Sequence, residues 1–122
     1  MTDRVLIVDD HVSFRLMARR LLTTDGFDVV GEAGDGPGAV AAVRELRPDV
    51  VLLDVQLPGP DGFAVAGELA EQEAPPVVVL VSSRSSSDYG RRVAESPVRG
   101  FITKSELSGE ALRRVLGSRA CA

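Results

Sequence analysis

Short apolar runs alternate along this chain with segments whose apolar residues recur at helical spacing. We interpret the runs as strands of a sheet, at residues 4–8, 28–33, 49–53, 77–81 and 100–103. The spacing between and after them predicts helices, at residues 13–23, 39–46, 63–73, 88–95 and 106–116. Strands that are apolar on both faces and alternate with helices are typical of a parallel sheet covered on both sides.

The connections limit how such strands can be ordered. Right-handed crossovers leave few topologies. We predict an α/β fold with a doubly wound, five-stranded parallel sheet of flavodoxin-like order 2-1-3-4-5. Residues 1–122 then form a single domain, a length that supports one hydrophobic core.

The segment at residues 88–95 is the weakest of the predicted helices. It is polar, Gly90 interrupts it, and its apolar support comes from Tyr89, Val93 and Ala94. We expect an element of low stability that a small energetic bias can move.

Composition narrows the class of protein. With 44% apolar and 26% charged residues the chain is globular. Its net charge is −4 without a Lys/Arg cluster, so we expect no direct nucleic-acid binding by this domain. Cys121 is the only cysteine and is interpreted as an incidental thiol, which fits a reducing compartment. Without a signal-peptide pattern or a long apolar run, we expect a cytoplasmic protein without membrane contact.

Charged residues directly follow three of the predicted strands. Asp9 and Asp10 follow the first strand, Asp54 the third and Lys104 the fifth. The carboxyl ends of parallel strands meet at one edge, where open α/β folds place their sites. Helix capping alone would account for Asp9 and Asp10 but not for the other charges. We therefore predict a crevice suited to a divalent cation and phosphoryl chemistry. His11, the only histidine, is interpreted as a helix-start or rim residue and not a metal ligand.

With these residues the chain resembles a response-regulator receiver domain, CheY-like, over essentially its whole length. The landmarks come in order, each at its own strand end: Val8-Asp9-Asp10, Leu53-Asp54, Ser82 and Lys104, with support from Leu57-Pro58-Gly59-x-Asp61-Gly62 and Phe101. The Asp10-His11 pair and Ser105, where many receivers have Pro, are most similar to receivers of NarL/LuxR-type regulators.

The resemblance implies the receiver of a two-component phosphorelay response regulator. Asp54 would accept a phosphoryl group from a phosphohistidine of a sensor histidine kinase or phosphotransfer protein. The reaction would depend on Mg²⁺ (or Mn²⁺), with Asp10, Asp54 and the backbone carbonyl of Gln56 as direct ligands and Asp9 acting largely through water. Lys104 would pair with the phosphoryl oxygens as a mobile point charge.

The resemblance also implies a switch. Ser82 would donate its hydroxyl to the phosphoryl group, and Phe101 would turn into the vacated space. Phe101 lacks the hydroxyl of the Tyr often found there, so its rotamers would differ by packing alone. The fourth helix, fifth strand and fifth helix would change and address a downstream protein target. Two alternatives stay open: Ser83 could take the place of Ser82, and Phe101 could be a core residue.

Other classes of function fit parts of the pattern. A Mg²⁺-dependent phosphohydrolase with an aspartyl-phosphate needs a second Asp two residues after the nucleophile, where Gln56 stands without capacity for proton transfer. We therefore expect a signalling acceptor that catalyses its own phosphoryl transfer and dephosphorylation, and not a turnover enzyme. The alternative is a receiver-fold binding module that works without phosphorylation, although the complete charged set argues against it.

The state of assembly is less constrained. We expect a stand-alone receiver rather than a fragment of a DNA-binding regulator, because the sequence is that of one domain. A homodimer could form through the fourth-helix face or through the first and fifth helices, and the sequence decides for neither.

Overall fold

The computed structural model describes residues 3–120, with side chains described through residue 117. Cys121, interpreted above as an incidental thiol, lies outside these residues. Five parallel strands form one sheet in the order β2-β1-β3-β4-β5, which confirms the predicted topology. The strands are β1 (Arg4–Val8), β2 (Asp28–Ala33), β3 (Val50–Asp54), β4 (Val77–Ser82) and β5 (Gly100–Thr103).

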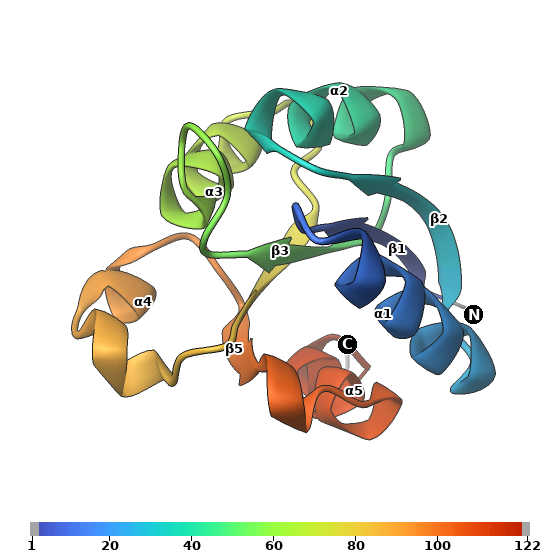
Figure 1. The fold of residues 1–122 in the computed structure, drawn as a ribbon. Helices are drawn as coiled ribbons and strands as arrows, with labels where there is room; N and C mark the ends of the chain where they lie inside the picture. The colour runs from blue at the N-terminus through green and yellow to red at the C-terminus, as the bar shows by residue number, and fades with distance from the viewer. Residues whose placement is uncertain (1–2, 121–122) are drawn as a thin grey trace.

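Helices cover both faces of the sheet (Figure 1). Two of them, α2 (Gly36–Leu46) and α3 (Gly62–Ala70), pack on one face, and α1 (Val12–Thr24) and α5 (Gly109–Ala120) pack on the other. The short α4 (Arg92–Glu95) lies beside the β4–β5 end of the sheet, after a 3₁₀ turn, η1 (Ser86–Tyr89). A second 3₁₀ turn, η2 (Lys104–Glu106), follows β5.

The central strands are buried on both faces. In β1, Val5 and Ile7 face the α1–α5 side, whereas Leu6 and Val8 face the α2–α3 side, and all four are fully buried. Burying each such side chain stabilises the fold by about 1.5–3 kcal/mol. A charge directly after a strand of this kind is therefore held at the strand's carboxyl end by a rigid support.

The predicted fourth helix is wrong as a continuous element. Residues 86–95, called the η1–α4 segment from here on, form a 3₁₀ turn and a single α-helical turn. Gly90 separates them with φ 58, in the left-handed region. Ser85 and Asp88 cap η1 through a reciprocal pair of hydrogen bonds. The segment is thus built from two short pieces, neither of which has a buried residue.

The other four helices differ from the prediction at one or both ends, the first by only one residue at each end. The second begins at Gly36, earlier than predicted, because the Asp35 side chain accepts a hydrogen bond from the Gly38 N–H at 2.8 Å. The fifth begins at Gly109, after η2, where the Gly109 N–H donates to Asp25 Oδ2 at 2.8 Å. The third ends at Ala70, before the predicted residue 73. Within the described range, none of the helices has the length and apolar character to span a bilayer.

Candidate functional site

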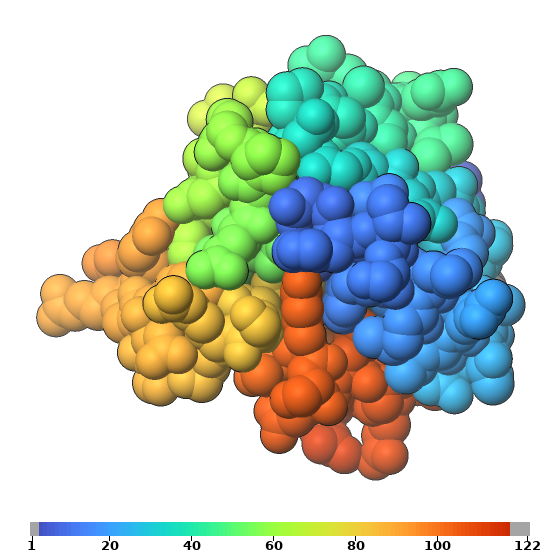
Figure 2. Space-filling view, viewed as in Figure 1, coloured from blue at the N-terminus to red at the C-terminus, as the bar shows by residue number. Residues whose placement is uncertain are grey.

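The carboxyl ends of four strands bring the predicted site residues together. They are Asp9 and Asp10 after β1, Asp54 at the end of β3, Ser82 at the end of β4 and Lys104 after β5. In the sheet register Asp54 is level with Val81, and Ser82 is level with Thr103. Figure 2 shows the blue segment after β1, the green segment after β3 and the orange segment after β5 meeting on one face of the molecule.

Two buried carboxylates share one ammonium at this edge. Asp9 is 0% and Asp54 is 2% exposed to solvent. Lys104 Nζ lies 2.5 Å from Asp9 Oδ2 and 3.5 Å from Asp54 Oδ2. It also lies 4.4 Å from the ring centroid of Phe14, which is a cation–π contact. Lys104 is the only lysine of the chain, and it leaves the pair of carboxylates with a net negative charge.

The environment of the site shifts the pKa of Asp54. Burial, and after it the nearby charge of Asp9, raise the pKa of Asp54, which comes to about 6 in the folded protein. Lys104 and the Gln56 N–H, which donates to Asp54 Oδ1 at 3.3 Å, oppose that rise in pKa. The carboxylate is therefore less well compensated than a surface Asp, and an added positive charge would stabilise it.

The donor atoms fit a small divalent cation. Asp9, Asp10, His11 and Asp54 each offer one ligand atom, and these atoms all lie within 4.8 Å of one another. Asp9 Oδ2 accepts no hydrogen bond from the described residues and has only its ion pair with Lys104. Carboxylate oxygens are the ligands that Mg²⁺ prefers. A buried, under-compensated oxygen beside two further carboxylates is the arrangement that such an ion requires.

His11 lies at the rim of this cluster. It is the N-cap residue of α1, as the sequence indicated, and its side chain is 66% exposed. Its Nδ1 atom lies 3.1 Å from Asp9 Oδ1 and 3.1 Å from Asp10 Oδ1. His11 thus contacts both carboxylates from the solvent side. The interpretation of His11 as a residue that does not bind the metal stays a prediction.

The loop after β3 is anchored close to Asp54. A Cβ atom at Gly62 would lie 2.4 Å from the Asp54 carbonyl oxygen, so only glycine allows this approach. The Gly62 N–H donates to the Val55 carbonyl at 2.7 Å. Asp61 caps α3 by accepting from the Ala64 N–H at 3.0 Å. The anchored loop places Gln56 on the exposed side of the site, two residues after Asp54.

Ser82 is the serine that the fold buries. It is 0% exposed at the end of β4, whereas Ser83 is exposed. Its hydroxyl contacts the hydroxyl of Tyr89, with 2.6 Å between the two oxygens. Phe101 is half-buried, and its ring centroid lies 5.9 Å from that of Tyr89. Sequence reasoning counted Tyr89 only as weak apolar support for a helix, because nothing in the sequence shows which side chain reaches Ser82.

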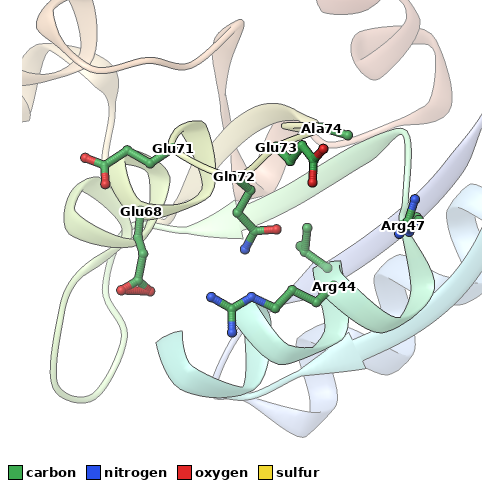
Figure 3. Close-up of a pocket in the computed structure, with 8 residues that line it drawn as sticks. Arg44, Arg47, Glu68, Glu71, Gln72, Glu73 and Ala74 are labelled. Carbon is green, nitrogen blue, oxygen red and sulfur yellow. The ribbon is translucent and has the colours of Figure 1, made fainter.

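A second hollow lies away from this site. A cavity of about 650 Å³ opens between the ends of α2 and α3 (Figure 3) and is lined by Val43, Arg44, Arg47, Glu68, Glu71, Gln72, Glu73 and Ala74. These residues precede β3 and β4 or lie at the helix ends nearby, so the cavity is at the amino ends of the strands. It mixes charges of both signs and contains none of the strand-end carboxylates.

Comparisons with known proteins agree with this fold and site. A family model described as the response regulator receiver domain matches residues 5–116. The DNA-binding transcriptional activator EvgA of Escherichia coli (strain K12) is 32% identical over 101 residues, which are 83% of this chain and 50% of EvgA. The transcriptional regulatory protein PdtaR of Mycobacterium tuberculosis (strain ATCC 25618 / H37Rv) is 36% identical over 101 residues, 83% of this chain and 49% of PdtaR.

Among solved structures, the signal receiver domain of the response regulator NarL from Mycobacterium tuberculosis is similar throughout. Its TM-score is 0.82 at 33% sequence identity, covering 95% of this chain and 98% of that domain. The fold and the acidic strand-end site thus define a signalling receiver. The chain belongs to the response regulator receiver domain family, and it spans about half the length of the curated relatives it matches.

Proposed function

We propose that this domain is a phosphorylation-controlled switch in which Asp54 is the acceptor. The observation that carries the proposal is the buried pair Asp9 and Asp54 facing a single Lys104 ammonium. Two buried carboxylates that face one cation are under-compensated, and a bound proton or a further cation would relieve them. Membership of the receiver family supports this assignment.

In the proposed reaction Asp54 acts as a nucleophile. One of its carboxylate oxygens forms a bond to phosphorus while the bond from phosphorus to the donor's imidazole nitrogen breaks, and that nitrogen keeps the electron pair. At pH values above its pKa of about 6 the Asp54 carboxyl is ionised, which is the form that can attack phosphorus. Lys104, already 3.5 Å from Asp54 Oδ2, can move with the phosphoryl oxygens and hold their charge.

A metal ion would be held by Asp9, Asp10, Asp54 and the backbone carbonyl of Gln56. When bound, Mg²⁺ would supply the charge compensation that phosphoryl transfer needs. Two observations support this set. Asp9 Oδ2 is buried and accepts no hydrogen bond from the described residues, and the possible ligand atoms of the cluster lie within 4.8 Å of one another. Mn²⁺ prefers the same kind of oxygen ligand and would be a substitute.

The partners follow from the role of a receiver. A sensor histidine kinase or a phosphotransfer protein would donate the phosphoryl group. A downstream protein would read the surface formed by α4, β5 and α5. The domain would then be a signalling acceptor without substrate turnover, and any DNA binding would belong to other parts of a regulator such as EvgA.

The test is the intact mass of the protein after incubation with acetyl phosphate. We expect one phosphoryl adduct on the wild type with Mg²⁺, and none when EDTA replaces the metal. Asp54→Asn removes the nucleophile and should give no adduct. Asp28→Asn is the matched control, because it makes the same change at an exposed position of β2 and should be modified like the wild type.

The same experiment addresses the rival function. A phosphorylation-independent binding module of receiver fold would give no adduct on any variant. Equal modification of wild type and Asp54→Asn would also contradict the proposal, since it would place the acceptor elsewhere.

A further inference from the structure

The hydroxyl of Ser82 is already engaged in this structure. Its Oγ lies 2.6 Å from the Tyr89 hydroxyl oxygen and accepts a hydrogen bond from the Arg84 N–H at 3.1 Å. Ser82 is fully buried, so solvent cannot replace either partner at low cost. Any reaction that needs this hydroxyl must therefore change its hydrogen bonds.

Tyr89 reaches Ser82 from a separate element. Its ring packs edge-on against Phe63, with the centroids 5.6 Å apart, and against Phe101 at 5.9 Å. Phe101, the strand residue beside it, has no hydroxyl. Among these three rings, the polar contact to Ser82 thus belongs to the η1–α4 segment and not to β5.

We propose that Tyr89 is a positioning residue for phosphoryl transfer: its hydroxyl tethers Ser82 in the resting state and must release it when Asp54 is phosphorylated. The inference rests on the proposed role of Asp54 as acceptor. It assigns the link between the site and the η1–α4 segment to one hydrogen bond.

Hydrogen-bond accounting supports the release. A serine hydroxyl has one proton to donate and two lone pairs. The Arg84 N–H occupies one lone pair, and Tyr89 occupies either the proton or the second lone pair. A phosphoryl oxygen can only accept. If Ser82 donates its proton to Tyr89, the phosphoryl oxygen competes for that proton and the contact at 2.6 Å must break. If Tyr89 is the donor, the contact is lost when the Ser82 oxygen turns toward the phosphoryl group, which is the movement that the proposal assigns to it.

The segment that carries Tyr89 can respond to this loss. Its two short turns meet at Gly90, whose φ of 58 makes it a natural pivot. The far turn is held to α3 by Arg92, which lies 2.9 Å from Asp61 Oδ2 and stacks 4.2 Å above the Phe63 ring centroid. Release of Tyr89 would loosen the near turn while Arg92 keeps the far turn attached.

Two measurements test the tether. Tyr89 is the only tyrosine and the chain has no tryptophan, so ring-labelled tyrosine gives a single NMR signal from this position. We expect that signal to shift on treatment with acetyl phosphate and Mg²⁺ in the wild type and to stay unchanged in Asp54→Asn.

A double-mutant cycle supplies the second readout, the rate of adduct formation. Tyr89→Phe keeps the ring packing and removes only the hydroxyl, and we expect it to accelerate phosphorylation about fivefold, the effect of one net hydrogen bond. In a Ser82→Ala background the same substitution should change nothing, because the tether is already absent. A role in packing alone would not distinguish the two backgrounds.

The outcomes separate the two proposals. Adduct on the wild type with an unmoved tyrosine signal, or with equal rates for Tyr89 and Tyr89→Phe proteins, overturns the tether and leaves Asp54 as the acceptor. Equal acceleration in both serine backgrounds overturns it as well, since the effect would not pass through Ser82. No adduct on the wild type overturns the proposed function, and the tether with it.

Discussion

At the residue scale, the site is defined by an imbalance of charge. Asp9 and Asp54 are buried, and among the described residues the ammonium of Lys104 is the one side-chain cation within ion-pair distance of either carboxylate. Burial of an uncompensated carboxylate costs stability unless the group binds a proton or a cation. The raised pKa of Asp54 reflects that cost, because burial disfavours the charged form.

This imbalance predicts how stability depends on pH. The pKa of Asp54 is about 6 in the folded protein, against 3.8 as its ordinary value. A raised pKa means that its contribution to stability is fully present below pH 3.8 and is lost as the pH rises through about 6. Asp54→Asn should therefore stabilise the metal-free protein by about 2–3 kcal/mol at pH 7.5 relative to its effect at pH 4.

Urea unfolding in EDTA at the two pH values measures this difference. The exposed Asp28→Asn serves as the control and should shift stability equally at both. If the free energy of unfolding changed with pH in the same way in the wild type and in Asp54→Asn, the pKa of Asp54 would not be raised by folding.

Removing the single cation should have the opposite effect. Lys104→Met removes the ammonium that both buried carboxylates share, and we expect a loss of about 3 kcal/mol at pH 7.5. At pH 4 the loss should be much smaller, because Asp54 is then protonated. The same urea titrations report it, and a loss that does not depend on pH would point to packing against Phe14 instead.

At the element scale, the strands could be predicted well and the helix ends less well. Strands β1, β3 and β4 are apolar on both faces. Such apolar runs are easy to recognise in a sequence, and the end of each run marks the position of the polar residue that follows. The η1–α4 segment has no buried residue to set a period, so its sequence could not show the break at Gly90. The contact between the hydroxyls of Tyr89 and Ser82 could not be predicted either, because it depends on the path of that segment.

The approach of α3 to β3 can be tested at one glycine. Gly62→Ala would put a Cβ atom 2.4 Å from the Asp54 carbonyl oxygen, and we expect it to destabilise the protein by about 1–3 kcal/mol. Gly67 lies on the same helix with open space around it, so Gly67→Ala should stabilise by about 0.5–1 kcal/mol. Thermal unfolding compares the two, and similar shifts in both would contradict the anchoring of the loop at Gly62.

At the scale of the whole molecule, we expect the site to couple ion binding to folding. The acidic cluster is assembled from residues after β1 and at the end of β3, and only the folded chain brings them together. A ligand that binds only the folded state stabilises it by mass action. The strand order could be predicted from the alternation of strands and helices with right-handed crossovers, whereas the relative burial of Asp9 and Asp10 needed the structure.

This coupling predicts that Mg²⁺ raises the melting temperature. At a free concentration ten times its Kd the ion should add about 1.4 kcal/mol, or about 4–6 °C for a chain of this size. Asp54→Asn should reduce the shift, because one carboxylate ligand is lost. Melting curves in EDTA and in increasing Mg²⁺ measure it, and an unchanged wild-type curve at millimolar Mg²⁺ would count against the site.

The central claim is that Asp54 itself carries the phosphoryl group. Its most direct test is reduction of the acetyl-phosphate-treated protein with borohydride, which converts an aspartyl phosphate into homoserine, followed by peptide mass spectrometry. We predict homoserine at position 54 in samples treated with Mg²⁺ and none in samples treated with EDTA. Homoserine at Asp9 or Asp10, or none anywhere in a protein that carries the adduct, would contradict the assignment.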